Sequence, residues 1–229
     1  MQRAHPWAVV GYWSLTAVVL LLAVVLAIDA PVDATMGPIQ KLLYLHLPVA
    51  ANAFLGAMVV FVASIGGIGG RRQPWEDLGH AAAIVTVLNA TVLLVTGVLW
   101  AKTAWGVWWT WSPRLTFSLA LWLLYCGYLI VHGRISSPAT RGVITAIYGM
   151  VAFIDVPLVY LAAKMLPDVH SRGLGITPAM QPALWMWFLA ITLVSGGLID
   201  ARFRIDRGAL GRWRDQHPLP PSPSAGALS

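Results

Sequence analysis

The chain has 229 residues, of which 58% are hydrophobic and only 10% are charged, and its mean hydropathy is +0.72. Soluble domains carry about a quarter charged residues, so this composition excludes a soluble globular protein. The single cysteine, Cys126, excludes a disulfide framework and every paired-cysteine motif. The partner expected for the net charge of +6 is a lipid bilayer rather than a nucleic acid.

Long charge-free gaps predict the transmembrane helices, because a hydrocarbon core about 30 Å thick takes roughly 20 helical residues. Six such gaps occur, and only Asp155 interrupts one of them. The sequence therefore predicts an all-α integral membrane protein, a six-helix bundle that forms one membrane domain over residues 1–201. The predicted helices lie near residues 9–28, 44–68, 79–101, 116–133, 142–163 and 183–199.

The distribution of Lys and Arg predicts the orientation of this bundle. With six spans both termini share a side, and that side collects ten of the 15 Lys and Arg residues, against five on the other. Short cytoplasmic loops carry the excess of positive charge, so both termini are expected in the cytoplasm. Residues 202–229 then form a basic and afterwards proline-rich cytoplasmic tail.

The predicted topology separates the six histidines. Only His46, at the start of the second helix, and His170, between the fifth and sixth, fall on the external side. A hydrated histidine at the membrane interface is the simpler interpretation of each. Neutral imidazole is also a common ligand of metals and haem iron, so the pair is a candidate ligand set.

A tryptophan-rich segment connects the third and fourth helices. Residues 100–116 hold five of the 12 tryptophans of the chain, whereas anchors at a membrane interface are usually scattered. At helical pitch Trp105, Trp108 and Trp109 share one face, which predicts a flat aromatic platform for a planar apolar ligand. The guanidinium of Arg114 can pair with a carboxylate, so a porphyrin with its propionates meets both requirements.

Polar residues inside the spans are the remaining candidates. Asp155 precedes Pro157, and two interpretations stay open: a functional group such as a proton relay, or a protonated carboxyl hydrogen-bonded to a neighbouring helix. Asn89, Thr91 and Thr96 on the third helix predict interhelical hydrogen bonds.

Three segments resemble the tryptophan-rich "WWD" proteins that handle haem in cytochrome c biogenesis, and among these the six-span CcmC family. They are WGVWWTWSPRLT (105–116), LYLHLP (43–48) and FIDVPLVY (153–160), and the resemblance covers about residues 40–200. The family usually has Asp after the last tryptophan, whereas this chain has Ser112 and Pro113. The proline is expected to hold Ser112 out of helical geometry.

The resemblance implies that haem b is held at the external face of the bacterial cytoplasmic membrane, with His46 and His170 as axial ligands of its iron. It implies delivery of haem to the chaperone CcmE, in company with the ATP-binding-cassette subunits CcmA and CcmB and the small CcmD. No Gly-Lys dipeptide occurs, so the chain lacks a P-loop and is predicted to be a haem-transfer subunit rather than an enzyme. The implied haem-binding residues are Trp105, Gly106, Trp108, Trp109, Trp111 and Arg114.

Other classes of protein compete with this interpretation. Larger WWD proteins attach haem to apocytochromes, but they carry more spans than this chain. A small-molecule transporter would use broken or charged segments at mid-membrane, and Asp155 and Pro157 are the only residues that fit this description. A purely structural membrane subunit would leave the tryptophans unexplained.

Overall fold

The structure is a computed structural model that describes residues 6–32, 37–68, 72–165 and 176–216, and these residues are helical or lie in short connections. Six segments are long and apolar enough to cross a membrane, the fifth of them built from two helices, so the six-span all-α prediction is confirmed. The elements are α1 (Pro6–Asp29), η1 (Pro38–Leu42), α2 (Leu43–Ile68), α3 (Arg72–Trp105), α4 (Pro113–Arg134), α5 (Pro138–Ala152), α6 (Asp155–Met165), η2 (Pro178–Met180) and α7 (Gln181–Gln216).

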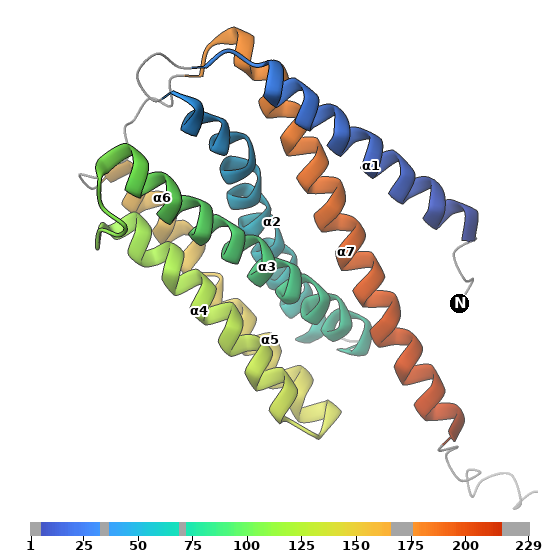
Figure 1. Ribbon diagram of the computed structural model, residues 1–229. Helices are drawn as coiled ribbons and strands as arrows, with labels where there is room; N and C mark the ends of the chain where they lie inside the picture. Colours follow the sequence, from blue (N-terminus) through green and yellow to red (C-terminus); the bar gives the residue numbers. More distant parts are fainter. Residues whose placement is uncertain (1–5, 33–36, 69–71, 166–175, 217–229) are drawn as a thin grey trace, which may run out of the picture.

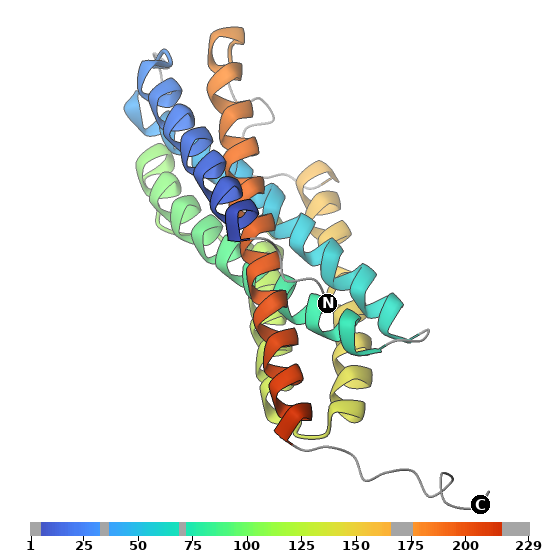
Figure 2. The same cartoon turned by 90° about the vertical axis from the view of Figure 1, so that its right-hand side faces the viewer.

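The helices form an elongated bundle with two distinct ends. Figure 1 shows α1 lying antiparallel along α7 on one side, α2 and α3 in the middle, and α4 with α5 and α6 on the other side. Residues 106–112, here called the tryptophan loop, join α3 to α4 at one end, which we call the loop end. The connection between α4 and α5 and the C-terminal part of α7 lie at the opposite or far end (Figure 2).

Small residues hold α2 tightly against α3. A Cβ added at Gly56 on α2 would lie 2.3 Å from the Thr86 hydroxyl oxygen on α3, so only glycine allows this approach. The buried alanines around the contact include Ala53, Ala57 and Ala82. Membrane helices lack a hydrophobic force between them, and close backbone approach at small residues supplies the dispersion contacts instead.

Polar side chains link α3 to the surrounding helices. The Asn89 amide donates to the Ser195 hydroxyl on α7 at 3.0 Å, and the Trp122 indole N–H on α4 donates to the Thr91 hydroxyl at 2.9 Å. The Thr96 hydroxyl oxygen lies 2.8 Å from Nδ1 of His46 on α2. The predicted interhelical role of these three polar residues of α3 is therefore confirmed.

The fifth span is broken, a feature that the single predicted helix over 142–163 lacks. Pro157 has no N–H to continue the helical ladder, and tight turns replace it: Ile154 N–H donates to Val151 O and Val156 N–H to Phe153 O, each at 3.1 Å. Asp155 lies in the first turn of α6 and is only 6% exposed.

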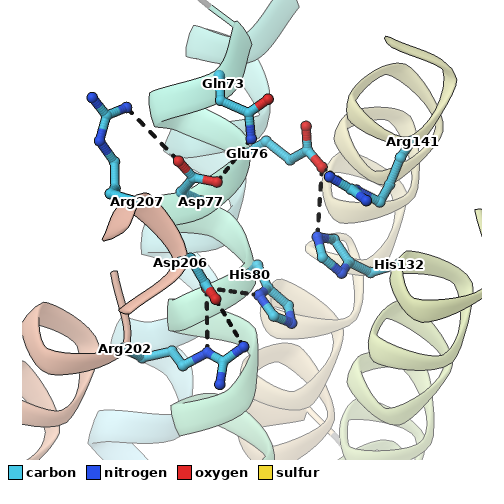
Figure 3. A network of polar contacts seen from close by, with 9 residues as sticks. All are labelled: Gln73, Glu76, Asp77, His80, His132, Arg141, Arg202, Asp206 and Arg207. Atoms are coloured by element: carbon cyan, nitrogen blue, oxygen red, sulfur yellow. Dashed lines mark hydrogen bonds and ion pairs between the residues drawn. The ribbon is translucent and has the colours of Figure 1, made fainter. Parts of the chain in front are cut away.

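At the far end, α7 continues to Gln216, well past the predicted helix over 183–199, so the predicted boundary at residue 201 falls inside α7. The continuation packs its charges against α3. Figure 3 shows the resulting group, which we call the far-end ionic cluster. Its members are Gln73, Glu76, Asp77, His80, His132, Arg141, Arg202, Asp206 and Arg207.

The far-end ionic cluster joins four helices through paired charges. Glu76 on α3 contacts Arg141 on α5 and lies 3.5 Å from the His132 ring nitrogen on α4. His80 on α3 contacts the Asp206 carboxylate on α7 at 2.9 Å. Because most of these side chains are largely buried, each needs its partner to offset the loss of water.

Replacing Arg141 by Met should destabilise the bundle, because it leaves the Glu76 carboxylate buried without its guanidinium. Breaking one side of a buried pair typically costs about 3 kcal/mol or more in the free energy of unfolding. The double variant Glu76→Gln/Arg141→Met should recover most of that loss. Denaturant unfolding in detergent measures both.

Arg204→Met is the matched control, because Arg204 and Asp200 form an exposed i,i+4 pair and its loss should leave stability unchanged. Equal stability of the Arg141 and Arg204 variants would contradict a stabilising role for the cluster.

Candidate functional site

A pocket of about 1320 Å³ opens between α2, α3, α4 and α6 at the loop end of the bundle. Ligand sites for small molecules usually measure roughly 300–1,000 Å³, so this one accepts a large ligand. Its lining is mostly apolar and extends along α2 from His46 to Phe54, with Phe153 from the break before α6 and Val156 from the first turn of α6. The few polar groups of the lining include His46, Arg114 and Lys164.

His46 lies in the first turns of α2, as predicted, and its ring is fixed by a hydrogen bond to α3. Its Nδ1 lies 2.8 Å from the Thr96 hydroxyl oxygen, and that hydroxyl donates its proton to Val92 O at 2.7 Å. When that proton lies on Val92 O, the Thr96 oxygen accepts from Nδ1–H of His46. This tautomer leaves Nε2 as the unprotonated nitrogen, which is the atom that ligates a metal.

Two further residues of α3 shape the surroundings of His46. A Cβ added at Gly97 would lie 3.2 Å from the imidazole Cε1, so glycine gives the ring its space. The buried Trp100 ring meets the imidazole edge-on, with centroids 6.1 Å apart. The sequence places Trp100 in the tryptophan-rich segment but predicts no contact with His46, and it does not single out Gly97, because both contacts depend on how α2 pairs with α3.

The tryptophan loop is not helical, so the prediction that Trp105, Trp108 and Trp109 share a helical face is wrong. Helix α3 ends at Trp105, and Gly106 takes a positive φ of 75°, a conformation that favours glycine and ends helices. The Lys102 ammonium donates to Gly106 O at 3.0 Å and fixes the turn.

The tryptophan rings also differ from a single flat platform. Trp109 lines the pocket and meets Trp111 edge-on, with ring planes 79° apart. Trp108 and Trp111 are 57% and 75% exposed and lie outside the pocket lining. The side chain of Trp105, and His170 as a whole, lie outside the described residues.

Arg114 enters the pocket from the first turn of α4. Ser112 before it is extended, with φ −63° and ψ 150°, as the following proline predicts. Three buried atoms at the loop have no hydrogen-bond partner among the described residues: Trp109 Nε1, Thr110 Oγ1 and Ser112 Oγ. Unsatisfied buried polar atoms are rare. Three of them close together are typical of a place where a ligand or a second protein supplies the missing hydrogen bonds.

The histidines at the far end are held in a different way. The His80 and His132 rings stack nearly parallel, with centroids 3.8 Å apart, and each has a carboxylate beside it. Face-to-face rings at this distance leave no room for a porphyrin between them. Of the three histidines that the structure describes, only His46 lines the pocket.

His46 is one of the polar residues that line the pocket. Within the described part of the chain, no group of three or more His, Cys, Asp or Glu side chains can hold a bare metal ion. Iron in a porphyrin brings donors of its own and takes axial ligands, often histidine, from the protein.

These features define a multi-pass membrane protein with a large, mostly apolar pocket that is lined by one histidine, two tryptophans and one arginine among its residues. The chain belongs to the CcmC family, heme exporter protein C, whose profile matches residues 1–205.

Relatives of that name cover much of the sequence. Heme exporter protein C of Rhodobacter capsulatus is 32% identical over 162 residues, which are 70% of this chain and 65% of the relative. The Paracoccus denitrificans protein is 30% identical over 77% of this chain and 71% of its own length. The protein of Escherichia coli K12 is 28% identical over 76% and 73%.

Thr96→Val should remove the hydrogen bond that favours the Nδ1-protonated tautomer of His46, so that the proportion of this tautomer falls. Losing one buried hydrogen bond costs about 1 kcal/mol, enough to change a tautomer ratio about fivefold. Nitrogen NMR of protein labelled at histidine, in lipid nanodiscs, distinguishes a protonated from an unprotonated Nδ1. Thr96→Ser keeps the hydroxyl and should keep the wild-type spectrum, whereas identical His46 signals in the Val and Ser variants would show that Thr96 does not set the tautomer.

Proposed function

We propose that the chain binds haem b in the pocket at the loop end and delivers it to a haem chaperone for cytochrome c maturation. The observation that carries the proposal is the convergence of His46, Trp109 and Arg114 on one large apolar pocket. An imidazole with Nε2 unprotonated suits the iron, and the apolar walls suit the macrocycle. Arg114 suits a propionate, because guanidinium and carboxylate pair bidentately.

The second axial ligand in this proposal is His170. It follows five residues after Met165, where α6 ends, and α6 contributes Pro157, Tyr160 and Lys164 to the pocket. Helix α6, which precedes His170 in the chain, thus lines the same pocket as α2, and this supports His170 as the second imidazole. Two neutral nitrogens on opposite faces would complete the coordination of the iron.

Non-covalent ligation suits a delivery protein. With one cysteine in the chain and none in a CxxCH motif, haem cannot be fixed by two thioether bonds. A chaperone that presents its own ligand can therefore remove the haem. The exposed rings of Trp108 and Trp111 offer the chaperone an aromatic surface beside the pocket.

The partners that we propose follow from the family name and the sequence. Proteins named heme exporter protein C share this chain's family, which supports a place in a haem export system with CcmA, CcmB, CcmD and the chaperone CcmE. The chain has no P-loop lysine motif, so ATP would be hydrolysed by the cassette subunits.

The proposed membrane is the bacterial cytoplasmic membrane, with both termini inside and the tryptophan loop outside. Val107→Cys in a Cys126→Ser background should react with an impermeant maleimide on intact spheroplasts, because Val107 is exposed in the tryptophan loop. Ser136→Cys, exposed between α4 and α5, is the matched position at the far end and should react only after lysis. The reverse pattern would invert the proposed orientation.

The histidine pair is tested by absorption spectroscopy of the purified protein loaded with ferric haem. His46→Ala should convert the low-spin spectrum towards high spin and weaken haem binding about tenfold or more, because the iron loses one of two ligands. His170→Ala should behave alike, and added imidazole should restore the low-spin band in both.

His80→Gln is the control, because His80 lies in the far-end ionic cluster and should leave the haem spectrum unchanged. A low-spin spectrum that persists in the double variant His46→Ala/His170→Ala would rule out this ligand pair.

A further inference from the structure

The charges that line the pocket are all of one sign. Arg114 and Lys164 are its two fixed cations, and no Asp or Glu belongs to the described lining. The other walls are largely apolar. Such a pocket complements a large apolar ligand that carries more than one anionic group, and a single guanidinium would serve only one of them.

Lys164 lies on the pocket-facing side of α6. Pro157, Tyr160 and Lys164 follow one another at i, i+3 and i+7, which places them on one helical face, and all three line the pocket. The ammonium lies 5.7 Å from the centre of the Tyr160 ring, a contact that holds a cation on that face without neutralising it. No ion pair involves Lys164 within the described part of the chain.

We propose that Lys164 binds the second carboxylate of the haem, opposite Arg114, so that the pocket selects a porphyrin with two free carboxylates. The inference rests on the proposed function and adds a residue and a specificity to it. Arg114 enters from the first turn of α4 and Lys164 from the last turn of α6. Both therefore lie at the loop end, and the macrocycle extends from them along the apolar walls towards Phe54 and Phe153.

The two cations should differ in what can replace them. Arg114 offers a planar fork whose geometry lysine cannot reproduce, whereas Lys164 is an exposed point charge on a flexible stem. Lys164→Arg should therefore bind haem as the wild type does. Loss of the charge in Lys164→Gln should weaken haem binding about fivefold, a modest factor because solvent screens an exposed pair.

The test compares two ligands that differ only in their carboxylates. The full-length protein in nanodiscs is titrated with ferric haem b and with its dimethyl ester, and the Soret band reports binding of each. Lys164→Gln should weaken binding of haem b about fivefold and leave binding of the ester within about twofold of the wild type. Lys41→Gln removes a half-buried cation that hydrogen-bonds Ile28 O outside the pocket, and it should change neither affinity.

Each outcome has a distinct meaning. Unchanged haem b binding in Lys164→Gln would overturn the role of Lys164 and leave the proposed function standing. Equal loss for haem b and its ester would also overturn it, because the effect would then not act through a carboxylate. A wild-type protein that bound neither ligand would overturn the proposed function and this inference together.

Discussion

The close packing of α2 against α3 is the constraint on which the pocket depends. Gly56 lets the two backbones approach to the point where a Cβ would lie 2.3 Å from the Thr86 hydroxyl oxygen. Ten residues nearer the loop end, or about three turns, the same pair of helices brings His46 against Thr96 and Gly97. A tightly packed pair behaves as one rigid unit, so the geometry of His46 is set by packing far along both helices.

The broken fifth span adds a wall that a continuous helix would not provide. Pro157 interrupts the backbone ladder, and α6 then carries Tyr160 and Lys164 along the pocket. Asp155 at the break keeps its Oδ2 without a hydrogen-bond partner among the described residues, and it does not line the pocket. Broken helices recur at the substrate sites of transporters, because an irregular backbone inside a membrane is tolerated where it lines a cavity.

Much of this architecture can be predicted from sequence, because the thickness of the bilayer is a strong constraint on charge-free segments. The six spans, the position of His46 and the interhelical bonds of Asn89 and Thr91 follow from that constraint and from polarity. The arrangement of the tryptophans does not follow, since it depends on whether the helix continues through Gly106.

Residues that act through helix pairing are also hidden in the sequence. Gly97 and Lys164 come together only once α3 and α6 are placed around one pocket, and the sequence predicts an interhelical bond for Thr96 without showing that its partner is His46. The far-end ionic cluster is hidden for the same reason: its members are far apart in the sequence, and nothing there shows that they meet. His80 and His132 become a stacked pair only when α3 meets α4.

The most direct test of the central claim is an experimental structure of the haem-loaded protein in a lipid nanodisc. The account predicts porphyrin density inside the pocket, with the iron bound to Nε2 of His46 and one propionate against Arg114. Porphyrin density stacked outside the pocket on the exposed faces of Trp108 and Trp111, with no bond from His46 to the iron, would contradict it.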